Sequence, residues 1–417
     1  MKPAVGAIGG RVRRPGGPGT GNRGLWGALG SVAAGSMVAN LASYVVYIGA
    51  SQWLSAGDYG EFARLLSAML VLGVPALALQ SVIARETVHG VGVVRARVLT
   101  AQITAVVAAG LVLAVPIVVA VAKVGLGAAI AALCTAPLLV VIAAGQGVLQ
   151  GIGEFRALAW VLAAVGGLRT IPVVVALAVG AGPATALWAG TAGAAVAAAA
   201  VWMAVAGVMS ADARPSTAES SATATAASVL RASQVQLVLI VAVSIDLLLS
   251  GSVLSSEAAG VYALGAIATK AAFWLPQAIG VVFYPQLADA ASSRTSLRTA
   301  VRVVAMIGAG LTVGAALAGP LIPVILGADF QPLTSITWLF AYTGAVLAIL
   351  QVLLLSSIAA DRTHLSLITW VVVALEAVVI LTVCRSVVAL AATAAISVTI
   401  ATVITWLVAT GAQIRHR

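Results

Sequence analysis

The sequence predicts an all-α polytopic membrane protein with about twelve transmembrane helices, in two six-helix bundles related by a pseudo-two-fold axis along the membrane normal. Composition is the first reason: of 417 residues, 62% are hydrophobic and 8% are charged, whereas soluble globular chains carry roughly a quarter charged residues. The second reason is that the apolar residues come in blocks of about 20, the length a helix needs to cross roughly 30 Å of hydrocarbon. The third is a short repeat shared by the two halves of the chain.

The elements follow from the apolar blocks, which Gly, Pro, Ser and charged residues separate. The predicted spans are 27–50, 60–83, 98–121, 126–149, 158–180, 184–208, 229–251, 260–284, 300–325, 333–358, 365–384 and 387–411. The basic ends, 1–24 and 413–417, predict cytoplasmic tails, and the first is expected to be disordered because it is rich in Gly and Pro. The Ser-, Thr- and Ala-rich break at 209–228 predicts a cytoplasmic linker between an N-terminal lobe, 25–208, and a C-terminal lobe, 229–412.

The distribution of basic residues predicts the orientation. With both termini in the cytoplasm, nearly all Lys and Arg side chains near the span ends fall inside, and only Lys123 and Arg385 fall outside. The positive-inside rule therefore favours an inner (plasma) membrane protein with both termini cytoplasmic. These basic residues have no aromatic interleaving, which excludes nucleic acid as the partner that the net charge of +10 would otherwise suggest.

The internal repeat supports the division into halves. Leu54–Ala63 (LSAGDYGEFA) matches Leu254–Ala263 (LSSEAAGVYA), and each segment joins the first two spans of its half. Each following helix carries a proline at nearly the same depth, Pro75 and Pro276. With six spans per half, both copies enter the membrane in the same direction, which predicts parallel repeats with a central cleft between the bundles.

No catalytic or cofactor-binding constellation is present in the sequence. The three histidines, His89, His364 and His416, lie in loops or the tail without a second ligand at metal spacing, and Cys134 and Cys384 fit small buried hydrophobes. There is no Ser, His and Asp set and no Walker loop. We therefore expect no enzyme activity, no metal and no cofactor.

Six motifs in order carry a family resemblance. They are Leu54–Phe62, Leu149–Phe155, Ile245–Leu249, Ala258–Ala263, Phe283–Ala288 and Leu326–Phe330. Over about residues 25–411 the chain resembles the polysaccharide transporters, or Wzx-type flippases, of the multidrug/oligosaccharidyl-lipid/polysaccharide exporter superfamily. The resemblance implies movement of a polyprenyl-(di)phosphate-linked saccharide from the inner to the outer leaflet, through a cavity lined chiefly by the first, second, seventh and eighth helices. It also implies membrane lipids, and glycosyltransferases or a polymerase of the same pathway, as partners.

Five charged residues lie inside the predicted spans and more than three residues from their ends: Arg64, Arg169, Asp246, Lys270 and Glu376. Each costs about 2.5 to 3.5 kcal/mol at mid-helix, so each needs a partner or a wet cavity. The resemblance places Arg64, Asp246 and Lys270 on cleft helices, and we expect the two cations to contact the phosphate region, with Asp246 positioning Lys270 or exchanging a cation. The structural alternatives are snorkelling of Arg64 to the outer headgroups and an ion pair between Asp246 and Lys270. Glu376 and Arg169 are candidates for ion coupling or for a structural role.

The sequence leaves two transport functions open. A flippase for a lipid-linked saccharide is favoured, and an ion-coupled multidrug or metabolite exporter of the same superfamily is the alternative. In the second case Asp246 or Glu376 would be the cation-coupling carboxylate. An integral-membrane polymerase or glycosyltransferase would need a large external loop or a soluble acidic-motif domain, and the sequence has neither.

Overall fold

The computed structural model describes residues 44–88, 93–211, 234–274, 293–326, 328–359 and 366–411. Every regular element in these ranges is a helix, which confirms the all-α class. Nine helices within them are long and apolar enough to cross a membrane, or ten when one bent pair is taken as a single span. The predicted tails, most of the predicted linker and most of the first predicted span lie outside the described residues, so the predicted domain boundaries stay predictions.

The N-terminal bundle follows the predicted spans closely. A helical segment at residues 44–53 precedes the first labelled helix. The helices are α2 (Ala56–Leu72), α3 (Val74–Val88), α4 (Val93–Ala122), α5 (Leu126–Leu133), α6 (Thr135–Gly151), α7 (Phe155–Ala178) and α8 (Pro183–Ala211). Together α2 and α3 form one predicted span, and α5 and α6 form another.

The C-terminal bundle is built in the same way. Its elements are α10 (Gln234–Ala242), α11 (Ile245–Val253), α12 (Ser256–Trp274), α14 (Ser293–Ala318), η1 (Gly319–Leu321), α15 (Ile322–Leu326), η2 (Ala328–Leu333), α16 (Thr337–Ala359), α17 (Ser366–Val383) and α18 (Val387–Gly411). The predicted seventh span is the bent pair, α10 and α11, which meet at 43°.

Proline positions explain two of the interruptions. Proline lacks a backbone N–H and its ring crowds the preceding turn, so a helix tends to break just before it. The break between α2 and α3 falls at Gly73, two residues before Pro75. The break between α5 and α6 falls at Cys134, three residues before Pro137. Pro276, predicted as the counterpart of Pro75, lies outside the described residues.

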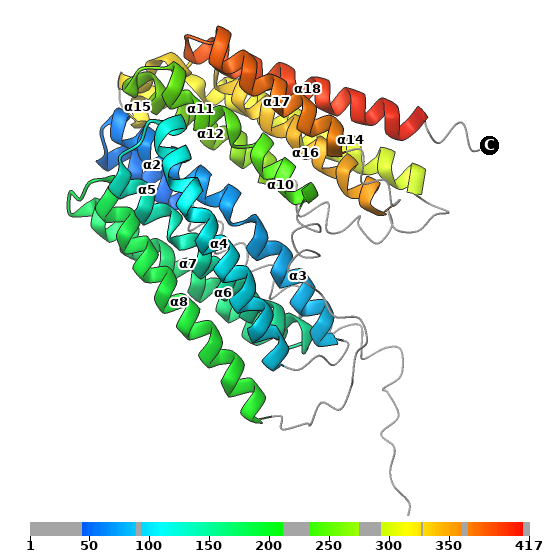
Figure 1. Ribbon diagram of the computed structural model, residues 1–417. Helices are drawn as coiled ribbons and strands as arrows, with labels where there is room; N and C mark the ends of the chain where they lie inside the picture. The colour runs from blue at the N-terminus through cyan, green and yellow to red at the C-terminus, as the bar shows by residue number, and fades with distance from the viewer. Residues whose placement is uncertain are drawn as a thin grey trace, which may run out of the picture.

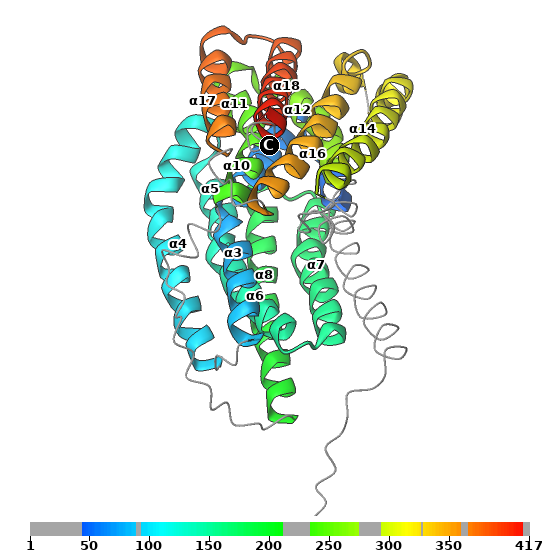
Figure 2. The ribbon, with the colours of Figure 1, turned by 90° about the vertical axis from the view of Figure 1, so that its right-hand side faces the viewer.

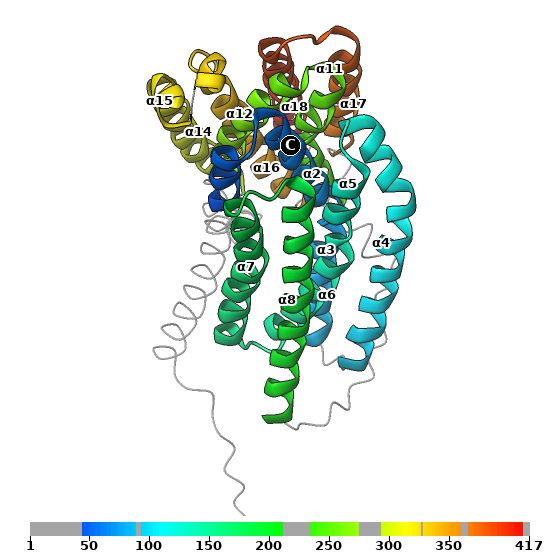
Figure 3. The same ribbon diagram turned by 90° about the vertical axis from the view of Figure 1, so that its left-hand side faces the viewer.

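The two bundles meet at one end and diverge toward the other (Figure 1). The meeting end holds the turns that precede α2 and α12, and its contacts join α2 to α11 and α12, and α4 to α11. We call it the sealed end, and the opposite end, where α3 and α8 finish and α10 begins, the divergent end. The same division is visible from two further sides, with α4 and α7 at opposite edges of the N-terminal bundle (Figure 2; Figure 3).

The hydrophobic cores match this shape. One core cluster at the sealed end includes residues of both bundles, among them Phe62, Leu247 and Tyr262. Toward the divergent end there are two clusters, one confined to the N-terminal bundle and one to the C-terminal bundle. Shared apolar burial therefore holds the bundles together at the sealed end.

The two copies of the repeat meet beside the predicted pseudo-two-fold axis. Ser55 and Ser255 both accept a hydrogen bond from the backbone N–H three residues later, so each repeat caps its helix in the same way. The two helices then touch at equivalent glycines: a Cβ on Gly60 would lie 2.9 Å from the Gly260 nitrogen. Residues related by the repeat can contact each other only beside a two-fold axis, so this contact agrees with the predicted symmetry.

Candidate functional site

Lys270 links the two bundles. It lies on α12, is 6% exposed, and its Nζ donates to Ser67 Oγ on α2 at 2.9 Å and to Tyr47 Oη at 3.1 Å. The same ammonium lies 4.8 Å from the centroid of the Tyr47 ring, within the range of a cation–π interaction. We call Lys270, Tyr47 and Ser67 the lysine bridge. It places a buried cation against neutral oxygens of the opposite bundle.

Asp246 is paired with a tyrosine. The Asp246 carboxylate is 4% exposed on α11. It accepts a short hydrogen bond from Tyr262 Oη and another from the Leu247 backbone N–H at 2.8 Å. Glu376 on α17 is 5% exposed and lies near enough to Asp246 to interact with it electrostatically. We call Asp246, Tyr262 and Glu376 the carboxylate cluster, which lies wholly in the C-terminal bundle.

The structure does not show the predicted contact between Asp246 and Lys270. In the described part of the chain no ion pair joins them, and their interaction is electrostatic at longer range. The structural alternative of an ion pair between α11 and α12 is therefore not observed. The reason is that each charge finds a nearer hydroxyl partner, Tyr262 for the carboxylate and Ser67 with Tyr47 for the ammonium.

Arg64 lies one helical turn along α2 from Ser67, on the same face of the helix. Its side chain is 3% exposed, and among the described residues its Nε and Nη1 atoms have no hydrogen-bond partner. The guanidinium packs close to Gly60 and Gly251, where the two bundles meet. This position between the bundles differs from the snorkelling alternative, in which the side chain would extend to the outer headgroups.

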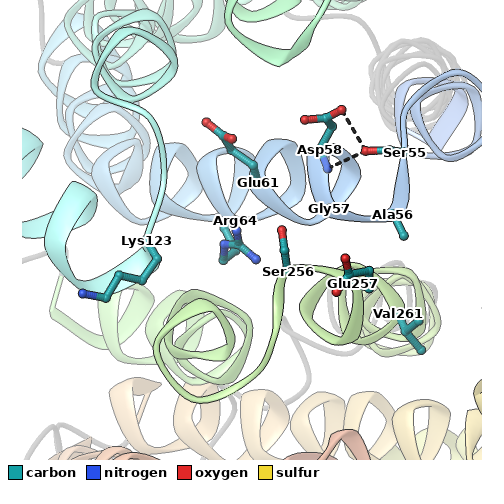
Figure 4. A pocket seen from close by; sticks show the side chains of 10 residues that line it. All are labelled: Ser55, Ala56, Gly57, Asp58, Glu61, Arg64, Lys123, Ser256, Glu257 and Val261. Carbon is teal, nitrogen blue, oxygen red and sulfur yellow. Dashed lines mark hydrogen bonds between the residues drawn. The ribbon is translucent and has the colours of Figure 1, made fainter.

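A pocket of about 560 Å³ lies at the sealed end beside Arg64 (Figure 4). We call it the sealed-end pocket. Its lining comes from the turns and first helical turns of both repeats and from the end of α4: Ser55, Ala56, Gly57, Asp58, Glu61, Arg64, Lys123, Ser256, Glu257 and Val261. Asp58 is held by Ser55 Oγ, which donates to its Oδ2 at 2.8 Å, and Glu61 Oε1 accepts from the Gly125 N–H at 2.9 Å.

Arg169 remains within the N-terminal bundle. It lies on α7, and its Nη2 approaches the Met69 sulfur on α2 at 3.9 Å. Thioether sulfur is a weak acceptor, so this contact orients the guanidinium more than it neutralises it. The structure therefore brings Arg64, Asp246 and Lys270 to the region where the bundles meet, and adds Glu376 but not Arg169 to that group.

Neutral hydroxyl groups were missing from the sequence prediction. Tyr47, Ser67 and Tyr262 supply the direct partners of the two predicted charges, and hydroxyl side chains in apolar spans carry no signal of their own. The repeat does contain a signal, because the residues 200 positions away from them are apolar: Leu247, Ile267 and Phe62. No group of three or more His, Cys, Asp or Glu residues in the described ranges is placed to hold a metal ion.

Comparison with known proteins gives structural neighbours. No protein-family model and no curated protein matches the sequence. In fold, the chain is similar to an inward-facing multidrug resistance MATE family transporter of the MOP superfamily, with a TM-score of 0.66 and 11% identity over 92% of this chain and 98% of that one. It is similar to the lipid II flippase MurJ in an inward closed conformation, with a TM-score of 0.62 and 10% identity over 91% and 87% of the two chains. A eukaryotic MATE transporter, AtDTX14, gives a TM-score of 0.61 and 11% identity over 91% and 94%.

These likenesses establish the two-lobed fold of MOP superfamily transporters for nearly the whole chain. The fold class predicted from the sequence is thereby confirmed. The neighbours themselves are transporters and a flippase, and the expectation that this chain is not an enzyme stays a prediction. The narrower resemblance to Wzx-type polysaccharide transporters stays a prediction.

Proposed function

We propose that this protein is a flippase that moves a polyprenyl-(di)phosphate-linked saccharide from the inner to the outer leaflet, for cell-surface polysaccharide biosynthesis. It would lie in the plasma membrane with both termini cytoplasmic and would alternate access between its two bundles. The sealed end would then be the external end, and the divergent end would face the cytoplasm. Membrane lipids and the glycosyltransferases or polymerase of the pathway would be its partners.

The lysine bridge is the observation that carries this proposal. A buried ammonium is costly unless it is paired, yet Lys270 meets only hydroxyl oxygens and a ring face in the described structure. A phosphate group would bind it more strongly than a neutral hydroxyl, because charge-assisted hydrogen bonds are roughly twice as strong. An anionic headgroup entering from the divergent end would therefore compete with Ser67 and Tyr47 for Lys270, and so loosen the contact that joins the bundles.

The driving force fits an anionic cargo. A cell interior that is electrically negative favours outward movement of an anion by about 2.3 kcal/mol per charge per 100 mV. Arg64, one turn further toward the sealed end, would provide a second cation on the outward path, since its guanidinium suits phosphate oxygens. Two cations in succession along α2 and α12 would keep the headgroup compensated while it crosses.

The test is lipid flipping in reconstituted vesicles. Lys270→Gln and Arg64→Gln are each expected to lower the rate at equal protein content, while Lys270→Arg is expected to retain most of it, because charge matters more than side-chain length. Arg169→Gln is the comparison variant within the N-terminal bundle. If both Gln variants flip the lipid at the rate of the unmodified protein, the cationic path does not exist.

The carboxylate cluster favours a second candidate, an exporter of a drug or metabolite coupled to an ion gradient. Asp246 and Glu376 are both buried and close enough to interact, so two negative charges there would repel each other and favour the binding of a proton or another cation. The fold is also that of a multidrug resistance transporter. Asp246→Asn and Glu376→Gln should abolish dependence on a sodium or proton gradient under this reading, and retention of that dependence in both variants would exclude it.

A further inference from the structure

We propose that the sealed-end pocket binds a phosphate oxyanion while the bundles are joined there, whatever molecule the protein transports. The site is separate from the lysine bridge, which lies one helical turn deeper along α2. The ligand is either free phosphate or the phosphate of a net-anionic lipid headgroup, in which no choline cation compensates the charge. Bound there, it would stabilise the sealed state.

Arg64 is the main reason. Arg64 is only 3% exposed and lines the pocket. Its Nε and Nη1 atoms have no hydrogen-bond partner among the described residues. A buried polar group without a partner costs free energy, and a charged one costs more. In Figure 4 the Arg64 side chain extends from α2 toward the C-terminal bundle, whereas Asp58 and Glu61 project from the other side of α2. Because Nε and Nη1 pack against Gly60 and Gly251, an anion in the pocket would meet the guanidinium at Nη2.

Two helix N-termini converge on the same pocket. Both α2 and α12 begin there, with Ala56 and Ser256 as their first residues, and both residues line it. The two ends are adjacent, since a Cβ on Gly57 would lie 2.7 Å from Ser256 Oγ. Each N-terminus carries a partial positive charge, which favours phosphate and other anions. The pseudo-two-fold axis thus brings two such ends together, one from each bundle.

The charged residues of the lining also allow an anion. Glu61 attracts Arg64 electrostatically but forms no ion pair with it, and its Oε1 is used by the Gly125 N–H. Asp58 is used by Ser55 at the start of α2. Lys123 is exposed and adds a second cation, so the lining holds two cations and three carboxylates. Of the three carboxylates only Glu257 accepts no hydrogen bond among the described residues, and we expect it to oppose an anion most. Removing Glu257 should therefore tighten binding.

Because the ligand would contact α2 and α12 together, it would bind the sealed state better than any state in which the bundles separate at this end. A ligand shifts a two-state equilibrium only by its difference in affinity for the two states. Phosphate is therefore expected to hold the sealed end closed and to lower its accessibility to reagents.

The experiment uses Ser256→Cys as a probe in a protein whose Cys134 and Cys384 are replaced by alanine. The full chain is placed in nanodiscs of phosphatidylcholine alone and treated with a polar maleimide in inorganic phosphate or in chloride at equal ionic strength. Phosphate should slow labelling and raise the thermal unfolding midpoint. Nanodiscs of phosphatidylcholine mixed equally with phosphatidylglycerol, without phosphate, test the lipid headgroup as the source. If neither inorganic phosphate nor phosphatidylglycerol slows the labelling, the proposal is wrong.

Three variants identify the site. Arg64→Gln should weaken the phosphate effect about tenfold or more, since it removes the charge-assisted hydrogen bonds, and Arg64→Lys should fall between. Glu257→Gln leaves Arg64 in place and should strengthen the effect, while Glu154→Gln, an exposed glutamate outside the pocket, should not change it. An unchanged phosphate effect in Arg64→Gln, or equal effects of the two glutamate variants, overturns the proposal. If Arg64→Gln does not fold, the two glutamate variants decide.

Discussion

The two repeats of this protein share a backbone and differ in their charges. The segment from residue 44 to α2 and the segment from α11 through α12 both contain a helix that ends at residue 53 or 253 and a second helix that starts at Ala56 or Ser256. Residues that begin and join these helices recur in both: Ser55 and Ser255 cap the helix starts, and Gly60 and Gly260 meet where the bundles touch. The close backbone contact between the bundles is therefore built from what the repeats have in common.

The polar clusters are built from what the repeats do not share. Lys270, Tyr47 and Ser67 correspond at the same offset of 200 to Leu70, Leu247 and Ile267, which are all apolar. The pair Asp246 and Tyr262 corresponds to Val46 and Phe62, a pair of similar shape without polar atoms. Both apolar residues are buried, Val46 at 7% and Phe62 at 0% exposure.

This difference between the repeats shows which residues folding requires and which it does not. The first repeat shows that an apolar pair satisfies the packing at the position of Asp246 and Tyr262, so the polar pair is not needed to build the fold. Replacing both partners of a buried hydrogen bond by apolar groups of the same shape is often nearly neutral. We infer that the charges of the second repeat are retained for binding or coupling.

The largest expected effect comes from breaking the shared contact. A Cβ on Gly260 would lie 1.8 Å from the Ala56 carbonyl oxygen, a distance that no repacking of side chains relieves because the obstacle is backbone. Gly260→Ala should therefore prevent the bundles from joining at the sealed end and should nearly abolish transport in vesicles. Labelling of Ser256→Cys should rise at the same time.

Glycines elsewhere in the C-terminal bundle supply the control for this variant. Gly310 and Gly314 on α14 have open space where a Cβ would be placed, so Gly310→Ala should leave transport unchanged. Alanine is also the better helix former, by roughly 0.5 to 1 kcal/mol, so stability should not fall. Equal transport in Gly260→Ala and Gly310→Ala would show that the bundles do not need the close glycine contact.

The same positions show how far the sequence predicts the structure. Apolar blocks predicted the helices well, because the length of a span is fixed by the membrane and not by tertiary contacts. Glycine spacing does not distinguish contacts from open surface, because Gly147 with Gly151 and Gly310 with Gly314 have the same spacing. The first pair packs against Gln80 and Ala84 of α3, whereas a Cβ on either glycine of the second pair would contact nothing in the described structure. Which face of a helix meets a neighbour depends on how the helices are arranged in the bundle, and the spacing of residues along one helix does not specify that arrangement.

The candidate site was predictable in its charges and not in its partners. Arg64, Asp246 and Lys270 stand out because an ionisable group in an apolar span is costly. Pairing Asp246 with Lys270 followed from opposite charge, but the Tyr262 hydroxyl lies closer and donates a hydrogen bond to the carboxylate directly. Comparing the repeats position by position would have revealed Tyr262, because it replaces Phe62 at an otherwise equivalent place.

An intermediate effect is expected from converting the polar pair into its apolar counterpart. Asp246→Val alone leaves the Tyr262 hydroxyl buried without a partner, which should lower the free energy of unfolding by about 1 to 3 kcal/mol. Asp246→Val combined with Tyr262→Phe recreates the pair of the first repeat and should recover most of that loss. Thermal unfolding in detergent measures both, and flux in vesicles measures transport.

The double variant distinguishes the two roles of the pair. A protein that regains stability but not transport would assign the polar pair to function. A double variant that is as unstable as the sum of the two single ones would show that the repeats are not interchangeable here. Normal transport in the double variant would remove Asp246 and Tyr262 from the ion-coupled mechanism.

The smallest expected effect concerns the hydroxyl groups of the lysine bridge. Ser67→Ala removes one neutral acceptor from Lys270 and leaves Tyr47 in place, so the loss is that of a single hydrogen bond, about 0.5 to 1.5 kcal/mol. Because that bond crosses from α12 to α2, its loss should favour separation at the sealed end and raise labelling of Ser256→Cys by up to about tenfold. Tyr47→Phe keeps the ring under the ammonium and should act in the same direction. Ser81→Ala is the matched control, since Ser81 Oγ donates to the Ala78 carbonyl within its own helix at 2.8 Å. If the Ser256→Cys probe is labelled at the same rate with Ser67→Ala as with Ser81→Ala, Lys270 does not hold the bundles together. The polar residues found in only one repeat would then serve substrate binding alone.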